Sequence, residues 1–294
     1  MSESLHALVA AELAEPVDPR ASAMAEAIAA LYPGAARAVL FYGSCLREKN
    51  LDGLMLDFYL IVSDYRAAYG KSWLATVNRM IPPNVFPFAH DGLAAKYAVL
   101  SAADLARLCS TAAPDPSVWA RFSQPARLVW VADDAARAAV VESVAQAAPT
   151  LIALTQPTMD AAARDDALAV WRAGFTLTYG AELRAERAAR PGSIVDADPG
   201  RYVRMFDAVQ PAPVTVPTEA ARADWRRMQA RGKRTVALRL AKASFTFAGG
   251  IDYLAWKINR HAGTQIVIRP WQRRWPLIGA LTLLPRLFRS GAVR

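Results

Sequence analysis

The stretch V-L-F-Y-G-S-C-L-R begins at Val39, and after a short loop a second stretch, L-M-L-D-F-Y-L-I-V, begins at Leu54. Each contains an apolar run of the length expected for a buried strand. The first run ends in Gly43-Ser44. Because glycine has no Cβ, the backbone at Gly43 can approach a phosphate closely. Ser44 and the amides that follow it can donate hydrogen bonds to phosphate oxygens at the start of a helix.

The second run contains a single carboxylate, Asp57, among apolar residues. A carboxylate in such surroundings is costly unless it is paired with a cation or binds a metal. Asp57 is therefore a candidate metal ligand. Two strands with Gly-Ser at the end of the first and an acid within the second are typical of a nucleotidyltransferase active site. The pattern alone leaves one alternative open, a strand–turn–strand unit with a solvent-facing Asp at a sheet edge.

Composition favours a globular protein of about two domains, because the chain has 294 residues and 54% of them are apolar. No apolar run approaches the ~20 residues that a spanning helix requires. Residues 1–17 lack the basic segment and apolar run of a signal peptide. The two cysteines are typical of a reducing compartment, and with three scattered histidines they argue against a zinc cluster. We therefore expect a cytoplasmic protein.

The net charge of +9 is unevenly distributed, since residues 260–294 contain seven arginines and no Asp or Glu. Such a tail predicts an anionic partner. Residues 277–288 are largely apolar, Trp271 and Trp275 precede them, and arginines flank them, as in a helix that lies in a membrane interface. We therefore expect residues 271–290 to contact the membrane. A helix docked on the protein's own core is the alternative. Residues 277–284 carry too little charge for nucleic-acid binding, so no nucleic-acid partner is expected.

The first 132 residues alternate strand and helix patterns, and the chain is helical beyond them. The expected strands are 37–42, 54–62, 84–89, 93–100 and 126–131, the fourth following the third through a short hairpin. The expected helices are 19–31, 66–80, 104–109, 160–189, 225–244 and 251–261. The sequence therefore predicts an α/β sheet domain over 1–132, a helical domain over 133–207, a proline-rich linker over 208–220 and a basic helical tail over 221–294.

Six stretches, in order, resemble the mitochondrial-type phosphatidate cytidylyltransferase family. They are F-Y-G-S-C, M-L-D-F-Y-L-I-V-S-D, P-P-N-V-F, A-K-Y-A-V-L-S, A-R-F-S-Q-P-A-R-L and, more loosely, T-Y-G-A-E-L-R, within residues 38–185. The resemblance implies a nucleotidyltransferase-like mixed sheet followed by a winged-helix-like helical domain. It also implies CTP and Mg²⁺ at their junction. The implied reaction is Mg²⁺-dependent in-line transfer to phosphatidate, giving CDP-diacylglycerol and pyrophosphate at the inner face of the membrane.

The resemblance also implies residue roles. Asp57 would hold Mg²⁺, and Gly43 and Ser44 would cradle the triphosphate. Lys96 and Arg121 would neutralise charge on the leaving pyrophosphate, and Lys96 would act with Asp57 in catalysis. Arg184 would contact the nucleotide.

One departure concerns the metal site. Many nucleotidyltransferases place a second acid two positions after the first, where this chain has Tyr59. The further metal ligands would then be Asp64, Asp91 or Glu182, of which we favour Asp64 and Glu182.

Several alternatives remain open from the residues. Lys96 could be a surface lysine on a strand, Arg121 part of a structural ion pair, and Arg184 a solvent-facing helix residue. At the level of function, a soluble nucleotidyltransferase acting on a small molecule or RNA is one alternative. A non-catalytic, membrane-binding relative is the other.

Overall fold

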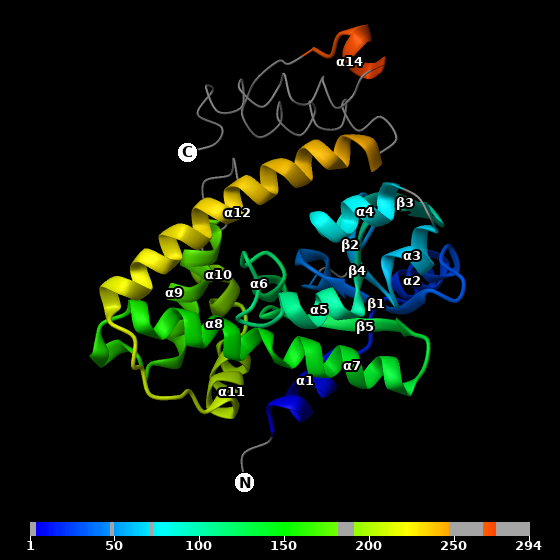
Figure 1. Ribbon diagram of the computed structural model, residues 1–294. Coiled ribbons are helices and arrows are strands. Elements are labelled where there is room, and N and C mark those ends of the chain that lie inside the picture. Colours follow the sequence, from blue (N-terminus) through cyan, green and yellow to red (C-terminus); the bar gives the residue numbers. More distant parts are fainter. Residues whose placement is uncertain (1–3, 48–49, 71–72, 182–190, 247–266, 275–294) are drawn as a thin grey trace.

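The central sheet has five strands in the order β3-β4-β2-β1-β5, and helices cover both of its faces (Figure 1). In this computed structural model, all residues are described except 1–3, 48–49, 71–72, 182–190, 247–266 and 275–294. The strands are β1 (Ala36–Tyr42), β2 (Met55–Val62), β3 (Asn84–His90), β4 (Leu93–Ser101) and β5 (Ala126–Val131). The pair β2–β4 is parallel and the other pairs are antiparallel. The predicted α/β class and all five predicted strands are confirmed.

The two faces of β2 differ as the alternation of its side chains requires. Leu56 and Phe58 point into a hydrophobic cluster formed with α2 (Pro19–Ala30). Tyr59 and Ile61 point into a second cluster, formed with residues of the N-terminal helix and of helices that follow β4 in the chain. Asp57 lies on this second face, at the end of the strand nearest the loop that follows Gly43.

The hairpin between β3 and β4 turns at Asp91-Gly92. Both residues have positive φ angles, 46° and 76°. Two-residue hairpin loops favour this conformation because its twist matches that of the flanking strands. The predicted hairpin is therefore confirmed.

The remaining described helices lie mainly after the sheet. They are α1 (Leu5–Ala14), α3 (Tyr65–Tyr69), α4 (Trp73–Met80), α5 (Ala102–Leu108), α6 (Trp119–Phe122), α7 (Asp134–Ala145), α8 (Ala147–Thr155), α9 (Ala167–Tyr179), α10 (Pro191–Asp196), α11 (Pro199–Val209), α12 (Thr218–Thr246) and α14 (Pro270–Arg274). Short 3₁₀ turns are η1 (Ser44–Arg47), η2 (Gln156–Thr158) and η3 (Ala161–Ala163). Among the described residues, one stretch, within residues 134–158, is long and apolar enough to cross a membrane. Within that stretch, 56% is buried in the protein. Such burial is typical of a core helix.

Several predicted boundaries were wrong. The helix expected over 66–80 is two helices, because Gly70 ends α3 with a φ of 64°. The helix expected over 160–189 begins only at Ala167, where the side chain of Asp166 accepts a hydrogen bond from the Ala169 amide. Its predicted part over 182–189 lies outside the described residues, as do the helix over 251–261 and the apolar segment 277–288. The expected linker is shorter than predicted, since α11 ends at Val209 and α12 begins at Thr218.

The helical region packs directly on the sheet. One hydrophobic cluster includes Ile61 of β2, Trp171 of α9 and Tyr202 of α11, together with Leu13 of the unpredicted helix α1. This cluster has members on both sides of residue 132, where the domain boundary stays a prediction.

Helix α12 crosses the molecule from the helical region to the sheet (Figure 1). At one end the indole of Trp225 donates to the carbonyl of Leu154 in α8. Further along, Gln229 donates to the carbonyl of Leu177 in α9. At the other end Arg239 and Lys242 donate to carbonyls of the segment that precedes β3. The basic helix predicted over 225–244 is therefore confirmed, and it is longer than expected.

Candidate nucleotide site

Three predicted site residues meet where β1, β2 and β4 lie side by side. Tyr42, which precedes Gly43, pairs with Asp57, and Asp57 pairs with Lys96 across the parallel strands. Gly43 itself has a φ of 97°, a conformation that L side chains rarely adopt. A Cβ built on Gly43 would lie 3.4 Å from Oδ2 of Asp57. Glycine therefore leaves the space beside the carboxylate open.

The carboxylate of Asp57 forms an ion pair with Lys96. Nζ of Lys96 lies 3.1 Å from Oδ1, and the two side chains are 33% and 26% exposed, respectively. Oδ1 is shielded from solvent and, apart from the ammonium group of Lys96, has no polar partner. A buried carboxylate oxygen of this kind is stabilised mainly by the cation beside it.

Ser44, directly after Gly43, is exposed and begins the 3₁₀ turn η1. The amide of Leu46 in this turn donates to the Gly43 carbonyl at 3.3 Å. The turn is shorter than the helix predicted after Gly-Ser. The structure nevertheless brings Ser44 to the same end of the sheet as Asp57.

Arg121 reaches the same face of the sheet from α6. Its guanidinium carbon lies 5.2 Å from the centroid of the Tyr42 ring, a cation–π distance. The ring of Tyr42 packs on that of Tyr59 at 5.0 Å, and Tyr59 packs on Phe122 at 5.2 Å. Arg121 is therefore held beside the residue that precedes Gly43.

Tyr59 occupies the position at which many nucleotidyltransferases have a second acid. Its side chain is buried, and burial raises its pKa, although the positive charges of Arg121 and Arg239 oppose that shift. Tyr59 is therefore a neutral packing residue of the hydrophobic cluster on this face of the sheet.

Asp64 does not lie with Asp57. The two aspartates are seven positions apart along an extended segment. At about 3.3 Å per residue, they lie roughly 23 Å from each other. The Asp64 carboxylate accepts hydrogen bonds from the amides of Arg66 and Ala67 at 2.8 and 3.0 Å. It caps the N-terminus of α3 at the opposite end of β2, so a single ion cannot bind both aspartates.

The other predicted ligands are dispersed. Asp91 lies in the exposed hairpin turn, 3.4 Å from Nε2 of His90. Glu182 and Arg184 lie outside the described residues. Within the described part of the chain, no three His, Cys, Asp or Glu side chains gather into a metal-binding group.

Arg239 of α12 also lies near the site, and it was not among the predicted site residues. Its guanidinium donates to the Pro82 carbonyl and to Oγ of Ser117, both at 2.7 Å. It also contacts the buried carboxylate of Asp115 at 3.4 Å. Arg239 thereby joins two loops beside the sheet face that carries Asp57. The available signal was the basic, acid-free second half of α12, which does not specify the contacts of any one arginine.

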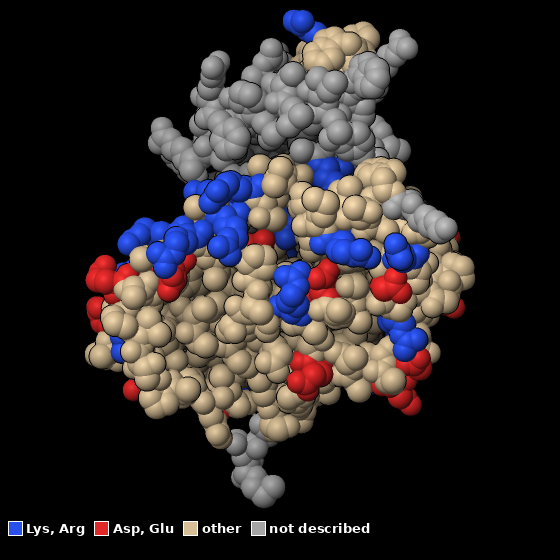
Figure 2. All heavy atoms as spheres, in the orientation of Figure 1, with Lys and Arg blue, Asp and Glu red and all other residues tan. Residues whose placement is uncertain are grey.

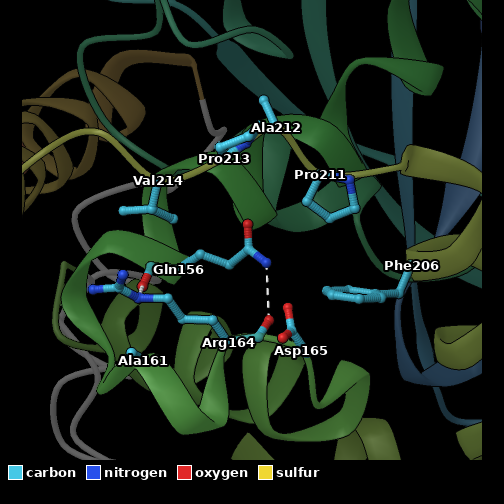
Figure 3. A pocket seen from close by; sticks show the side chains of 9 residues that line it. All are labelled: Gln156, Ala161, Arg164, Asp165, Phe206, Pro211, Ala212, Pro213 and Val214. Atoms are coloured by element: carbon cyan, nitrogen blue, oxygen red, sulfur yellow. Dashed lines mark hydrogen bonds between the residues drawn. The ribbon is translucent and has the colours of Figure 1, made fainter.

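A cavity of about 310 Å³ lies elsewhere, between η2, η3, α11 and the segment that follows α11 (Figure 3). Gln156, Arg164, Phe206 and Pro211 contribute to its lining. Arg164 donates there to the backbone carbonyls of Gln156 and Met159 at 3.0–3.2 Å. None of the predicted site residues lines this cavity.

No known family model matches the chain, and no curated protein matches its sequence. The assignment of a function therefore depends on the residues gathered around Asp57 and on their chemistry.

Proposed function

We propose that this protein is a nucleotidyltransferase that transfers the cytidylyl group of CTP to phosphatidate. The observation that carries the proposal is the meeting of Asp57 on β2, Lys96 on β4 and Gly43 directly after β1, with a carboxylate, a cation and an open backbone within one small area. These are the groups that nucleotide phosphates require, namely a metal-binding oxygen, a positive charge and a backbone without a Cβ.

The residues at Asp57 are compatible with Mg²⁺. This ion keeps several waters and is usually bound by one or two carboxylates together with substrate phosphates. Asp57 alone would supply the protein ligand, through its carboxylate, whose Oδ1 also lies 3.1 Å from Nζ of Lys96. When bound, the ion would neutralise negative charge on the triphosphate. Asp64 is not part of this proposal because its carboxylate caps α3.

The proposed reaction is an in-line displacement. An oxygen of the phosphatidate phosphate forms a bond to the α-phosphorus of CTP, and the bond between the α-phosphorus and the pyrophosphate oxygen breaks. Lys96 would neutralise charge on the departing pyrophosphate, and Arg121 would do so from the side of Tyr42. The phosphate nucleophile is already anionic near neutral pH, so the site requires no general base.

Phosphatidate is proposed as the acceptor on the basis of the sequence motifs. The mixed sheet supports a nucleotidyltransferase-like arrangement over residues 1–132, and helices α7–α11 supply the candidate for the winged-helix-like region. We also propose that the protein binds the inner face of the membrane through residues 271–290. Of the described residues in that segment, Trp271 is 42% exposed.

The decisive experiment incubates the full chain with labelled CTP, Mg²⁺ and liposomes that contain phosphatidate. The expected products are labelled CDP-diacylglycerol and pyrophosphate, formed only when all three components are present. Pyrophosphate release with a soluble phosphate ester or RNA, and none with phosphatidate, would assign a different acceptor. A melting temperature that CTP and Mg²⁺ do not change, together with no turnover, would favour a non-catalytic protein.

A further inference from the structure

Helix α4 carries an apolar stripe on its outer side. Trp73 and Met80, seven residues apart and therefore on one helix face, are 52% and 74% exposed. The opposite side is held against the sheet, since the buried Asn78 donates to the Val99 carbonyl at 3.0 Å. This anchoring directs the tryptophan and methionine outward. Arg79 is exposed beside them.

Helix α12 carries a basic stripe along one side. Arg227, Arg231, Arg234 and Leu238 follow one another at spacings of three or four residues, and all are exposed. After Asp224 the helix contains no acidic residue. Leu238, at the end of the stripe, is 52% exposed.

Helix α12 is fastened to the segment that follows α4, which brings the two helices near each other. Arg239, next to Leu238, donates to the Pro82 carbonyl, two residues beyond Met80, at 2.7 Å. Lys242 donates to the Pro83 carbonyl at 2.7 Å. In Figure 1, α4 lies directly below this end of α12. Figure 2 shows blue atoms along α12, and tan atoms with further blue atoms around the position of α4.

We infer that this surface, the α4–α12 face, lies against an anionic lipid bilayer. It comprises Trp73, Arg79, Met80, Arg231, Arg234 and Leu238. Tryptophan and exposed aliphatic side chains gain by entering the headgroup region of a bilayer. Arginines beside them pair with lipid phosphates while their stems lie along apolar surface. The phosphates of a nucleic acid would satisfy the arginines alone and would leave the apolar side chains in water.

The inference concerns the folded body of the protein and does not involve residues 271–290. It adds a second membrane contact to the proposed function, but it does not depend on nucleotide chemistry. Binding can therefore be measured without CTP, so the two proposals can fail separately.

The test measures sedimentation of the full chain with vesicles of two compositions. One contains phosphatidylcholine alone, and the other contains about 30% phosphatidylglycerol, which makes its surface strongly negative. Replacing Arg79, Arg231 and Arg234 together by Gln is expected to weaken binding to the anionic vesicles by at least about tenfold, because each arginine contributes near such a surface. It should also reduce the salt dependence of binding. The matched control is Arg204→Gln, which removes an exposed arginine of α11.

A single substitution reports on contact directly without risk to the fold. Leu238→Cys and, as its control, Leu31→Cys replace two side chains that are each 52% exposed. Both native cysteines, Cys45 and Cys109, are buried, so an environment-sensitive dye will label the new thiol. The fluorescence of the dye at position 238 should shift to the blue with anionic vesicles, and that at position 31 should not.

Four results would overturn the inference. The first is unchanged vesicle binding of the arginine variant. The second is an equal response of the dyes at 238 and 31. The third is a lower melting temperature of the arginine variant with intact vesicle binding, which would show that the face is covered by the protein itself. The fourth is binding of a soluble protein to the α4–α12 face without any response to vesicles, which would assign the face to another occupant.

Discussion

At the scale of single residues, the most consequential group is the carboxylate of Asp57. It is about one-quarter exposed, it is paired with Lys96, and one of its oxygens lacks a hydrogen bond. These properties distinguish it from Asp64, whose carboxylate is occupied by two backbone amides. They also distinguish it from Asp91, which lies in an exposed turn.

Asp57→Asn is expected to lower turnover by about 100-fold or more while the fold is retained, since it removes a key charge and preserves the shape of the side chain. Asp91→Asn, in the hairpin turn, is the matched control and should retain nearly full activity. The measurement is CDP-diacylglycerol formation, with thermal melting as the check on folding. Equal activity of the two variants would exclude Asp57 from the metal site.

Lys242 provides a prediction about pH. Burial, together with the nearby charge of Arg239, lowers the pKa of this lysine to about 7. In the unfolded chain the pKa would be about 10.4, so between these values the unfolded state binds more protons than the native state. The free energy of unfolding should therefore rise with pH from about 7 to 9, as linkage requires.

Replacing Lys242 by Met should remove this part of the pH dependence, whereas Lys233→Met, at a half-buried position of the same helix, should keep it. Urea unfolding at several pH values between 6 and 9 measures both. Parallel stability curves for the Lys242 variant and the unaltered protein would show that Lys242 does not titrate in this window.

At the scale of elements, the packing of α8 against α9 depends on Gly174. This glycine lies within α9 and faces α8. A Cβ at this position would lie 2.4 Å from Cδ2 of Leu151 and 2.9 Å from Oγ1 of Thr155. The glycine therefore permits the close approach of two helices.

Gly174→Ala is expected to be destabilising, because overpacking of a core typically costs about 1–3 kcal/mol. This exceeds the roughly 1 kcal/mol that alanine gains over glycine in a helix. Gly200→Ala in α11 is the control, since its Cβ would lie 3.4 Å from the nearest neighbouring atom, Nη1 of the flexible Arg204 side chain. Denaturant titration should show a lower midpoint for the first variant and an equal or higher midpoint for the second.

At the scale of the whole molecule, a buried ion pair joins the first described helix to the helical region. Arg201 of α11 pairs with Glu12 of α1, with one bond of 3.0 Å, and also donates to the Ser123 carbonyl at 3.0 Å. The two charged side chains are 7% and 14% exposed. Residues nearly 190 positions apart in the chain are thus held together across the predicted domain boundary.

Arg201→Met should lower the free energy of unfolding by about 3–5 kcal/mol, because it leaves the Glu12 charge buried without its partner. The double replacement of Arg201 by Met and Glu12 by Leu should recover part of this loss. Arg172→Met is the control, since it breaks an exposed pair with Asp196, and such pairs contribute about 0–1 kcal/mol. Unfolding followed by tryptophan fluorescence measures all three variants, and similar losses for Arg201→Met and Arg172→Met would contradict the prediction.

The strands, the hairpin and the two faces of β2 could be predicted from the amino-acid sequence, because they depend on local patterns. Alternating side chains, a Gly that adopts a positive φ and the Asp-Gly turn act over a few residues. The same local patterns identified Gly43 and Asp57 as a candidate site.

The groups that surround Asp57 could not be predicted in this way, because they come from distant segments of the chain. The parallel pairing of β2 with β4 brings Lys96 beside it, and the chain topology places Arg121 on the same face. Asp64 is excluded because strand geometry carries it to the far end of β2, where a helix uses its carboxylate. Neighbours across strands and between helices depend on register and packing between distant segments, which local sequence patterns do not encode.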